Sequence, residues 1–313
     1  IDLSGHRRLV SPLTDLEVLH DIAKDGRVLV EREIGTREIL FGSSEGGPER
    51  NLSWLEQSAL AAISNDGRTL LFEEQGEGGG PNGSVYLRPT DGGPAVRLGE
   101  GGADSLSPDG RWALTRSFSK DGTRLVMLPT AAGEPRPIPL DGYRVLGGDF
   151  APPDGKRIVF GATEPGKGLR AYVLDLAGGK PRAFTPEGIT AGAAFSPDGK
   201  SVAFTDAEHR PVICPVDGGA PKAIAGLESY DVPIQWSSDG DTIYVTREGE
   251  IPQSVYRYSL STGKKTAWKQ LMPADRAGLV RIERVYVTPD GAHYAYSLNR
   301  VTDSDLFVVT GWK

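Results

Sequence analysis

The chain has little of what several classes of protein depend on. Its 313 residues include one cysteine, Cys214, and four histidines with no close spacing, so neither an internal disulfide nor a zinc site is indicated. No apolar run approaches the ~18 residues of a membrane-spanning helix, and no window combines sustained helical periodicity with capping residues. Lys and Arg number 35 against 42 Asp and Glu, a balance that disfavours nucleic acid as a partner. We therefore expect almost no helix, no membrane span in this chain and no nucleic-acid binding.

Turn residues are abundant, with 41 glycines and 23 prolines. Asp-Gly pairs recur seven times between apolar segments, at successive spacings of 41, 43, 45, 44, 41 and 51 residues. The pairs begin at Asp25, Asp66, Asp109, Asp154, Asp198, Asp239 and Asp290. An Asp-Gly pair is typical of a tight β-hairpin turn, so we interpret these aspartates as structural. A period of about forty residues is that of one four-stranded blade of a β-propeller.

Each repeat predicts the same four strands, as residues 192–219 illustrate. The order is strand, Asp-Gly turn, strand, variable loop, strand, Gly-Gly turn and a short edge strand that often opens with proline. We predict an all-β protein, a seven-bladed β-propeller of four-stranded antiparallel blades that forms a single domain over residues 1–313. The predicted blades are 17–56, 58–101, 102–142, 143–188, 189–229, 230–280, and a last blade that combines 281–313 with 1–10.

The last blade is expected to be closed by strands from both ends of the chain. Residues 1–10 look like the end of a third strand, a glycine turn and a fourth strand, whereas 285–313 supply the first three strands of a repeat. The segment His6–Val10 is therefore predicted to form the outer strand beside Leu306–Val309. Such closure removes sheet edges that would otherwise associate.

The Ser-Pro-Asp-Gly-Arg/Lys turns at Ser107–Arg111 and Ser196–Lys200 resemble the WD40-like (PD40) repeats of TolB-type propellers. Four further segments resemble the C-terminal sensor halves of bacterial serine/threonine receptor kinases: Leu19–Ile22, Asn51–Leu55, Phe72–Gly101 and Ser304–Leu306. The resemblance implies an extracytoplasmic propeller that senses a ligand or protein, with a kinase domain and a membrane span preceding it in a parent protein.

Catalytic motifs are not supported by their context. Gly42–Gly46 matches Gly-x-Ser-x-Gly, but Gly47-Pro48 follows where a nucleophile elbow needs a helix. Gly78–Gly83 contains Gly-x-Gly-x-x-Gly, but a strand-like segment follows where phosphate binding needs a helix N-terminus. Kinase motifs are absent from this chain. We predict a non-catalytic binding or scaffold module; the alternative is a metal-dependent propeller lactonase or hydrolase with its site in the central channel.

Positions four and five residues before each turn aspartate fall on the innermost strand, which lines the channel of a propeller. The polar residues that we predict to bind ligand at the channel mouth are His20, Asp21, Asp104, Asp149 and Gln235. The alternative is that they hydrogen-bond to neighbouring blades or solvate the channel. No cofactor or metal site is predicted, although calcium in the channel stays open because distant aspartates converge there.

The expected partner is a protein, peptide or cell-envelope ligand, bound by a monomer. The loop Gly76–Gly83, five of whose eight residues are glycine, is expected to be a mobile element of the surface.

Overall fold

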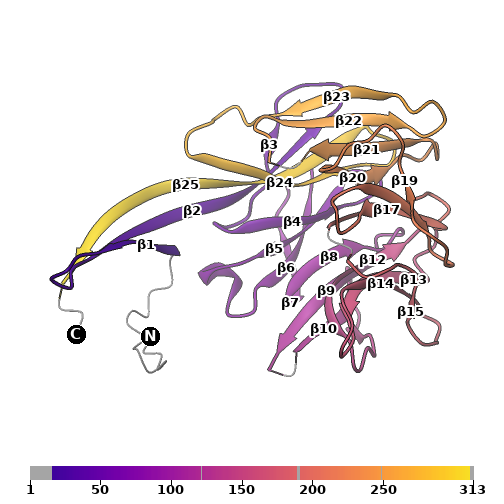
Figure 1. The fold of residues 1–313 in the computed structure, drawn as a ribbon, viewed down its shortest axis with the longest axis horizontal. Coiled ribbons are helices and arrows are strands. Elements are labelled where there is room, and N and C mark those ends of the chain that lie inside the picture. The colour runs from indigo at the N-terminus through magenta and orange to yellow at the C-terminus, as the bar shows by residue number, and fades with distance from the viewer. Residues whose placement is uncertain (1–15, 121, 189–190, 248, 311–313) are drawn as a thin grey trace.

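The structure, a computed structural model, describes residues 16–310 except 121, 189–190 and 248. The described strands form six antiparallel sheets (Figure 1). One short 3-10 helix, η1 (Glu77–Gly79), is the only helical element in these parts of the chain. None of the described residues forms a helix with the length and apolar character that crossing a membrane requires.

Five sheets contain four strands each, in sequence order. The first comprises β4 (Ser58–Ile63), β5 (Thr69–Glu74), β6 (Ser84–Pro89) and β7 (Val96–Glu100). The second comprises β8 (Gly102–Leu106), β9 (Trp112–Ser119), β10 (Gly122–Pro129) and β11 (Arg136–Pro137). The third comprises β12 (Arg144–Ala151), β13 (Arg157–Thr163), β14 (Arg170–Asp175) and β15 (Arg182–Ala183). The fourth comprises β16 (Ala191–Phe195), β17 (Ser201–Thr205), β18 (Pro211–Pro215) and β19 (Lys222–Ala223). The fifth comprises β20 (Asp231–Trp236), β21 (Thr242–Arg247), β22 (Gln253–Ser259) and β23 (Lys265–Leu271).

The sixth sheet joins the two ends of the described chain. Its strands are β1 (Leu16–Ile22), β2 (Val28–Ser43), β3 (Arg50–Asn51), β24 (Leu279–Val287) and β25 (His293–Val309). The order is β24-β25-β2-β3, and β1 pairs with the first half of β2. The closing blade thus takes its inner two strands from the C-terminal part and its outer two from the N-terminal part.

The apolar core is divided into six clusters, and each cluster lies between two neighbouring sheets. Tyr294 and Tyr296 of β25 pack with Val255 of the fifth sheet. On the other side, Ile39 of β2 packs with Phe72 of the first sheet. Because each blade buries both faces against its neighbours, the clusters form a closed ring of contacts, and this closure is what holds the short sheets together.

The predicted count of seven blades is not confirmed, because the described residues form six sheets. Six of the seven Asp-Gly turns join the first and second strands of a blade. The turn at Asp25 joins β1 to β2 outside the ring, while the second half of β2 is the third strand of the closing blade. The predicted blades 17–56 and 281–313 therefore share one sheet.

We call the part of this sheet that extends beyond the ring the arm; it consists of β1, residues 28–34 of β2 and residues 301–309 of β25. Figure 1 shows the arm projecting from the body of the ring. Leu306–Val309 pair on one side with Val28–Glu31 of β2, a pairing that the sequence did not predict. The segment His6–Val10 lies outside the described residues. Closure by strands from both ends is observed, but the N-terminal strands are β2 and β3.

The turn aspartates have the structural role expected of them. In each of the seven turns one carboxylate oxygen accepts a hydrogen bond from the N–H two residues later, at 2.8–3.1 Å. In the turns at Asp66, Asp109 and Asp198 a serine hydroxyl also donates to the carboxylate and, as the largest cause, lowers its pKa. The glycines that follow adopt positive φ, which explains the recurrence of Asp-Gly.

We expect Gly199→Ala to destabilise the protein more than Gly110→Ala, although φ is +67° and +70° at the two positions. Alanine at a positive φ costs about 1–2 kcal/mol at either position. At Gly199 a Cβ would also overlap the carbonyl oxygen of Pro152 in the preceding blade, whereas Gly110 faces open space. Overpacking of this kind adds about 1–3 kcal/mol. Urea unfolding of both variants measures the difference, and equal losses would show that this contact between blades is unimportant.

Candidate functional site

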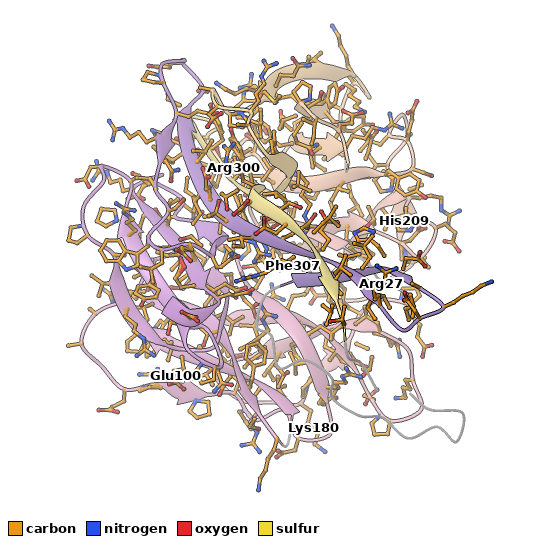
Figure 2. All side chains as sticks on the ribbon, turned by 90° about the vertical axis from the view of Figure 1, so that its left-hand side faces the viewer. Arg27, Glu100, Lys180, His209, Arg300 and Phe307 are labelled. Carbon is orange, nitrogen blue, oxygen red and sulfur yellow. The ribbon has the colours of Figure 1, made fainter. Side chains whose placement is uncertain are left out.

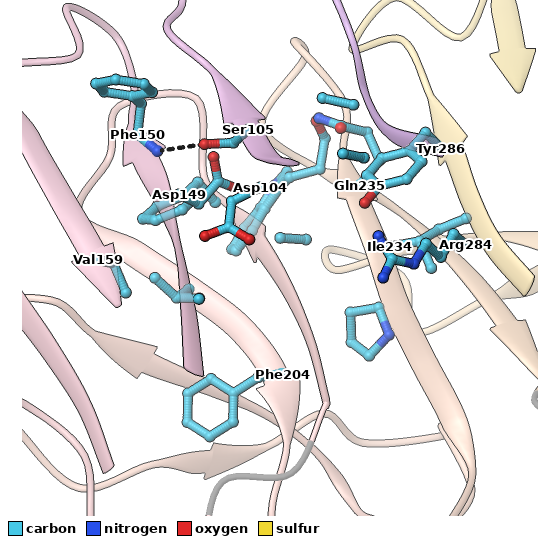
Figure 3. A pocket seen from close by; sticks show the side chains of 18 of the residues that line it. Asp104, Ser105, Asp149, Phe150, Val159, Phe204, Ile234, Gln235, Arg284 and Tyr286 are labelled. Carbon is cyan, nitrogen blue, oxygen red and sulfur yellow. Dashed lines mark hydrogen bonds between the residues drawn. The ribbon is translucent and has the colours of Figure 1, made fainter. Parts of the chain in front are cut away.

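The innermost strands of all six blades surround a central cavity of about 1220 Å³. These strands are β4, β8, β12, β16, β20 and β24. Figure 3 shows polar side chains from β8, β12, β20 and β24, together with the apolar side chains of Val159 and Phe204. A cavity of this size that combines apolar walls with a few convergent polar groups is typical of a ligand site.

A β-bulge on the innermost strand recurs around the cavity. The register of β4, β8, β12 and β20 shifts at Ala61, Asp104, Leu146 and Ile234 respectively. On β24 the shift spans Arg284 and Val285. All of these residues line the cavity. Bulges re-aim side chains and are frequent beside functional sites, so here they determine which side chains face the channel.

Asp104 connects two blades at the cavity wall. Its carboxylate accepts hydrogen bonds from Arg116 Nε at 2.7 Å and from the N–H of Gly148 on the next blade at 3.1 Å. Burial raises the pKa of Asp104 from 3.8 to about 7, while Arg116 and the Gly148 N–H act in the opposite direction. The hydrogen bond to Gly148 is a contact of the kind that the alternative expects, between a channel aspartate and a neighbouring blade.

Asp149 lies beside Asp104 in the cavity (Figure 3). Burial raises the pKa of Asp149 to about 7, and the Asp104 carboxylate adds to the rise, whereas the Ser105 hydroxyl and the Phe150 N–H lower it. Two neighbouring buried carboxyls hold a proton in common more readily than they ionise together. Because Asp104 contacts a guanidinium, we expect that proton to reside on Asp149.

Across the cavity from the two aspartates lie Gln235, Arg284 and Tyr286 (Figure 3). Arg284 Nη1 donates to the carbonyl oxygen of Leu60 at 3.2 Å, and its φ of +51° reflects the bulge. Burial raises the pKa of Tyr286 to about 12, so its hydroxyl remains a hydrogen-bond donor at neutral pH. The cavity therefore presents carboxyl groups on one side, and on the other a hydroxyl donor and a guanidinium whose Nη2 lies 3.8 Å from Glu73 Oε1.

The five residues predicted to bind ligand separate into two groups. Asp104, Asp149 and Gln235 line the same cavity. His20 and Asp21 do not, because their repeat lies in the arm and not in the ring. His20 Nε2 is 2.6 Å from Glu31 Oε2, and Asp21 accepts a hydrogen bond from the N–H of Ile22.

Sequence reasoning missed Arg284 and Leu146 as cavity residues. Arg284 is six positions before its turn aspartate and Leu146 eight, so counting back four or five positions passes over both. Bulges whose place varies between repeats cause this difference. An alignment of the repeats that allowed one inserted residue in each inner strand could have found Arg284.

The glycine loop Gly76–Gly83 lies at the surface, as predicted, except that Gly79 is buried. It borders a second cavity of about 370 Å³ together with Glu73 and Arg116. Arg116 Nη2 lies 3.6 Å from Glu73 Oε2, and the same guanidinium holds Asp104. One ion-pair chain therefore connects the glycine loop to the central cavity.

No metal site is assembled in the described parts of the chain. No group of three His, Cys, Asp or Glu side chains is placed to hold an ion there. Cys214 is buried, as expected, and burial raises the pKa of its thiol. Ser44, in the Gly-x-Ser-x-Gly match, lies in the turn after β2, where its N–H donates to the carbonyl oxygen of Ala292. The segment after Gly83 is strand β6.

No protein-family profile matches the chain. Among solved structures it is similar to a TolB from Agrobacterium tumefaciens, at 18% identity and a TM-score of 0.64 over 86% of this chain and 99% of that one. It is also similar to TolB from Acinetobacter baumannii, at 17% identity and a TM-score of 0.58 over 78% and 67% of the two chains. An oligogalacturonate lyase from Vibrio parahaemolyticus aligns at 14% identity and a TM-score of 0.53 over 83% and 77%. These likenesses show the fold alone: the chain has the fold of TolB-type β-propellers.

Proposed function

We propose that the chain is a non-catalytic binding module that takes a peptide-like ligand into its central cavity. The observation that carries the proposal is the arrangement of opposite charges across that cavity. Asp104 and Asp149 can accept from an amino group, while Arg284 and Tyr286 can donate to a carboxylate. The apolar wall between them suits side chains. A segment with free termini, such as a peptide of the cell envelope, complements this arrangement.

The biological setting that we propose follows the resemblance to sensor propellers. The chain would act as a monomer outside the cytoplasm, either as the sensing part of a receptor kinase or as a TolB-like envelope protein. The TolB neighbours support the propeller scaffold that this role needs.

Peptide binding can be tested by calorimetric titration with a panel of tri- and tetrapeptides that have free termini. We expect binding that is lost when both termini are blocked. Leu146 is 49% exposed and lines the cavity, so Leu146→Trp should obstruct entry and weaken binding at least tenfold without disturbing the core. Val96, an exposed residue of the outer strand β7, offers the matched control Val96→Trp. Equal affinity in the two variants would contradict the proposal.

The second candidate is a metal-dependent propeller enzyme with its site in the same cavity. The similarity to an oligogalacturonate lyase favours it, and another similar solved structure is an oligogalacturonate lyase in complex with manganese. The residues do not fit a bound metal well, because only Asp104 and Asp149 converge in the described part of the cavity. If the chain were such an enzyme, a Ca²⁺ ion would be held between these two carboxylates.

We expect no turnover of oligogalacturonate or lactone substrates above background with Ca²⁺ or Mn²⁺ present. Product formation followed by absorbance is the measurement. If the wild type turns over substrate and the Asp104→Ala, Asp149→Ala double variant does not, the binding-module proposal is wrong and the metal-dependent enzyme is supported.

A further inference from the structure

Within the described part of the chain, the arm has a sheet edge on β25 with no strand beside it. Residues 303–309 of β25 pair with β2 on one side. On the other side, β24 pairs with β25 only as far as Arg300, and the N–H of Val301 donates to the carbonyl oxygen of Gly278. From Asp303 to Val309 no described strand occupies this second side. An open edge of this kind is a template on which another extended segment can add as a strand.

This edge strand is unusually apolar for a segment in contact with solvent. Leu306 is 66% exposed, Val308 60% and Phe307 43%. Strand β1, at the opposite edge of the arm beyond β2, adds the exposed side chains of Leu19 and Ile22. Exposed apolar side chains that gather on one element mark a contact surface more often than isolated ones do.

A row of polar side chains fixes the three strands of the arm to one another. Glu31 in the middle strand accepts a hydrogen bond from Ser304 Oγ at 2.6 Å and lies 2.6 Å from His20 Nε2. The Ser304 hydroxyl and then His20 lower the pKa of Glu31. The arm is therefore braced across its width, and an ordered edge costs less entropy to extend than a flexible one.

The net negative charge of the arm determines whether a basic or an acidic strand would add to the edge more readily. Residues 16–34 and 301–309 contain seven Asp and Glu against three Lys and Arg. Asp303 and Asp305 lie on the open strand itself, and no ion pair with a described residue involves either of them. A basic segment would be attracted to this edge and an acidic one repelled.

The same charges disfavour a second copy of this chain as the occupant. Antiparallel pairing of 301–309 with its symmetry copy would place the two Asp305 carboxylates directly opposite each other, which is destabilising. The outer edge of β1 is a poorer template, because the register shift at His20 interrupts it. The edge of β25 is continuous over the same length.

We propose that an extended, basic segment of a partner protein adds as a strand to residues 303–309 of β25. Main-chain hydrogen bonds would supply affinity, Lys or Arg side chains would pair with Asp303 and Asp305, and apolar side chains would cover Phe307. This surface is distinct from the proposed ligand site, since none of residues 301–309 lines the central cavity. Viewed toward the face from which the arm projects, Phe307 lies in front of the middle of the ring and Arg27 lies to its right (Figure 2).

The test uses a capped seven-residue peptide of alternating Lys and Val as the probe, with fluorescence anisotropy as the measurement. A version in which Glu replaces Lys reverses the charge. A version with N-methylated valines keeps the charge but lacks half of the main-chain donors. We expect the Lys peptide to bind, the Glu peptide to bind at least tenfold more weakly, and the N-methylated peptide to lose at least fivefold. Hydrogen exchange of the full chain should slow at 303–309 when the Lys peptide is present.

The variant Asp303→Lys, Asp305→Lys should lower affinity for the Lys peptide at least tenfold. The control Glu134→Lys, Asp141→Lys makes the same change of charge at exposed positions of the second blade and should stay within twofold. The proposal would be overturned if the Lys peptide did not bind. It would also be overturned if the N-methylated peptide bound equally well, or if the two variants had equal affinity for the Lys peptide. A dimer in sedimentation with 303–309 protected in the absence of peptide would overturn it too, since that result would assign the edge to a second copy.

Discussion

The protein is expected to be more stable at pH 5.5 than at pH 7.5, because the channel carboxyls keep a proton in the folded state that they lose on unfolding. In the unfolded chain an aspartate ionises near pH 4. In the folded protein burial raises the pKa of Asp104 and of Asp149 to about 7. Between these values the folded state binds more protons than the unfolded state, so stability falls as pH rises. One such carboxyl contributes about 2 kcal/mol over this interval.

The variant Asp149→Asn isolates this effect. An amide is uncharged at both pH values, so we expect the variant to unfold at higher urea concentration than the wild type at pH 7.5. At pH 5.5 the two should be nearly equal. Asp141 is exposed, and Asp141→Asn serves as the control that leaves the pH dependence unchanged. An Asp149→Asn variant that is less stable at both pH values would show that ionised Asp149 holds the blades together.

Deletion of residues 1–51 should abolish cooperative folding, whereas deletion of residues 1–27 should preserve it. The longer deletion removes β2 and β3, and with them the buried side chains of Ile39, Leu40 and Phe41. Each such side chain is worth about 2–5 kcal/mol, so the loss is comparable to the whole stability of a domain, about 5–15 kcal/mol. The shorter deletion removes β1 and its turn but leaves the closing blade complete.

Calorimetry and sedimentation of the two truncated chains measure this difference. A six-bladed ring closed by β2 predicts a monomer with a nearly unchanged melting temperature for the shorter deletion. In a seven-bladed ring closed by residues 1–10, the shorter deletion would remove the closing strand. Aggregation of the 28–313 chain would therefore contradict the closure described above.

The repeat unit could be predicted from the sequence because hairpin chemistry is local. Asp-Gly pairs need only their own turn, and all seven are turns in the structure. The number of blades depends on which repeats pair with one another. Val28–Ser43 is one unbroken strand that serves both the arm and the ring. Its double role follows from pairing with β25, more than 250 residues away in sequence, which no local pattern reveals.

The candidate site was predicted where the repeats are regular and missed where they are not. Asp104 lies on a bulge five residues before its turn, so counting back from the turn placed it in the channel. Arg284 lies one residue further back, and the bulge that turns it inward arises from pairing with β25. His20 has the same offset as Asp104 and also lies at a bulge, but its hairpin is outside the ring. Sequence spacing thus predicts orientation within a hairpin but not where that hairpin is placed.

The claim that the channel is a binding site can be tested most directly by a crystal structure of the chain soaked with the peptide that binds most tightly in the titrations. We predict electron density for the peptide inside the central cavity, with its amino group beside Asp149 and its carboxylate beside Arg284. Crystals of the Leu146→Trp variant, soaked in the same way, should show none there. Peptide density confined to the outer strands, or equally present in both crystals, would contradict the account.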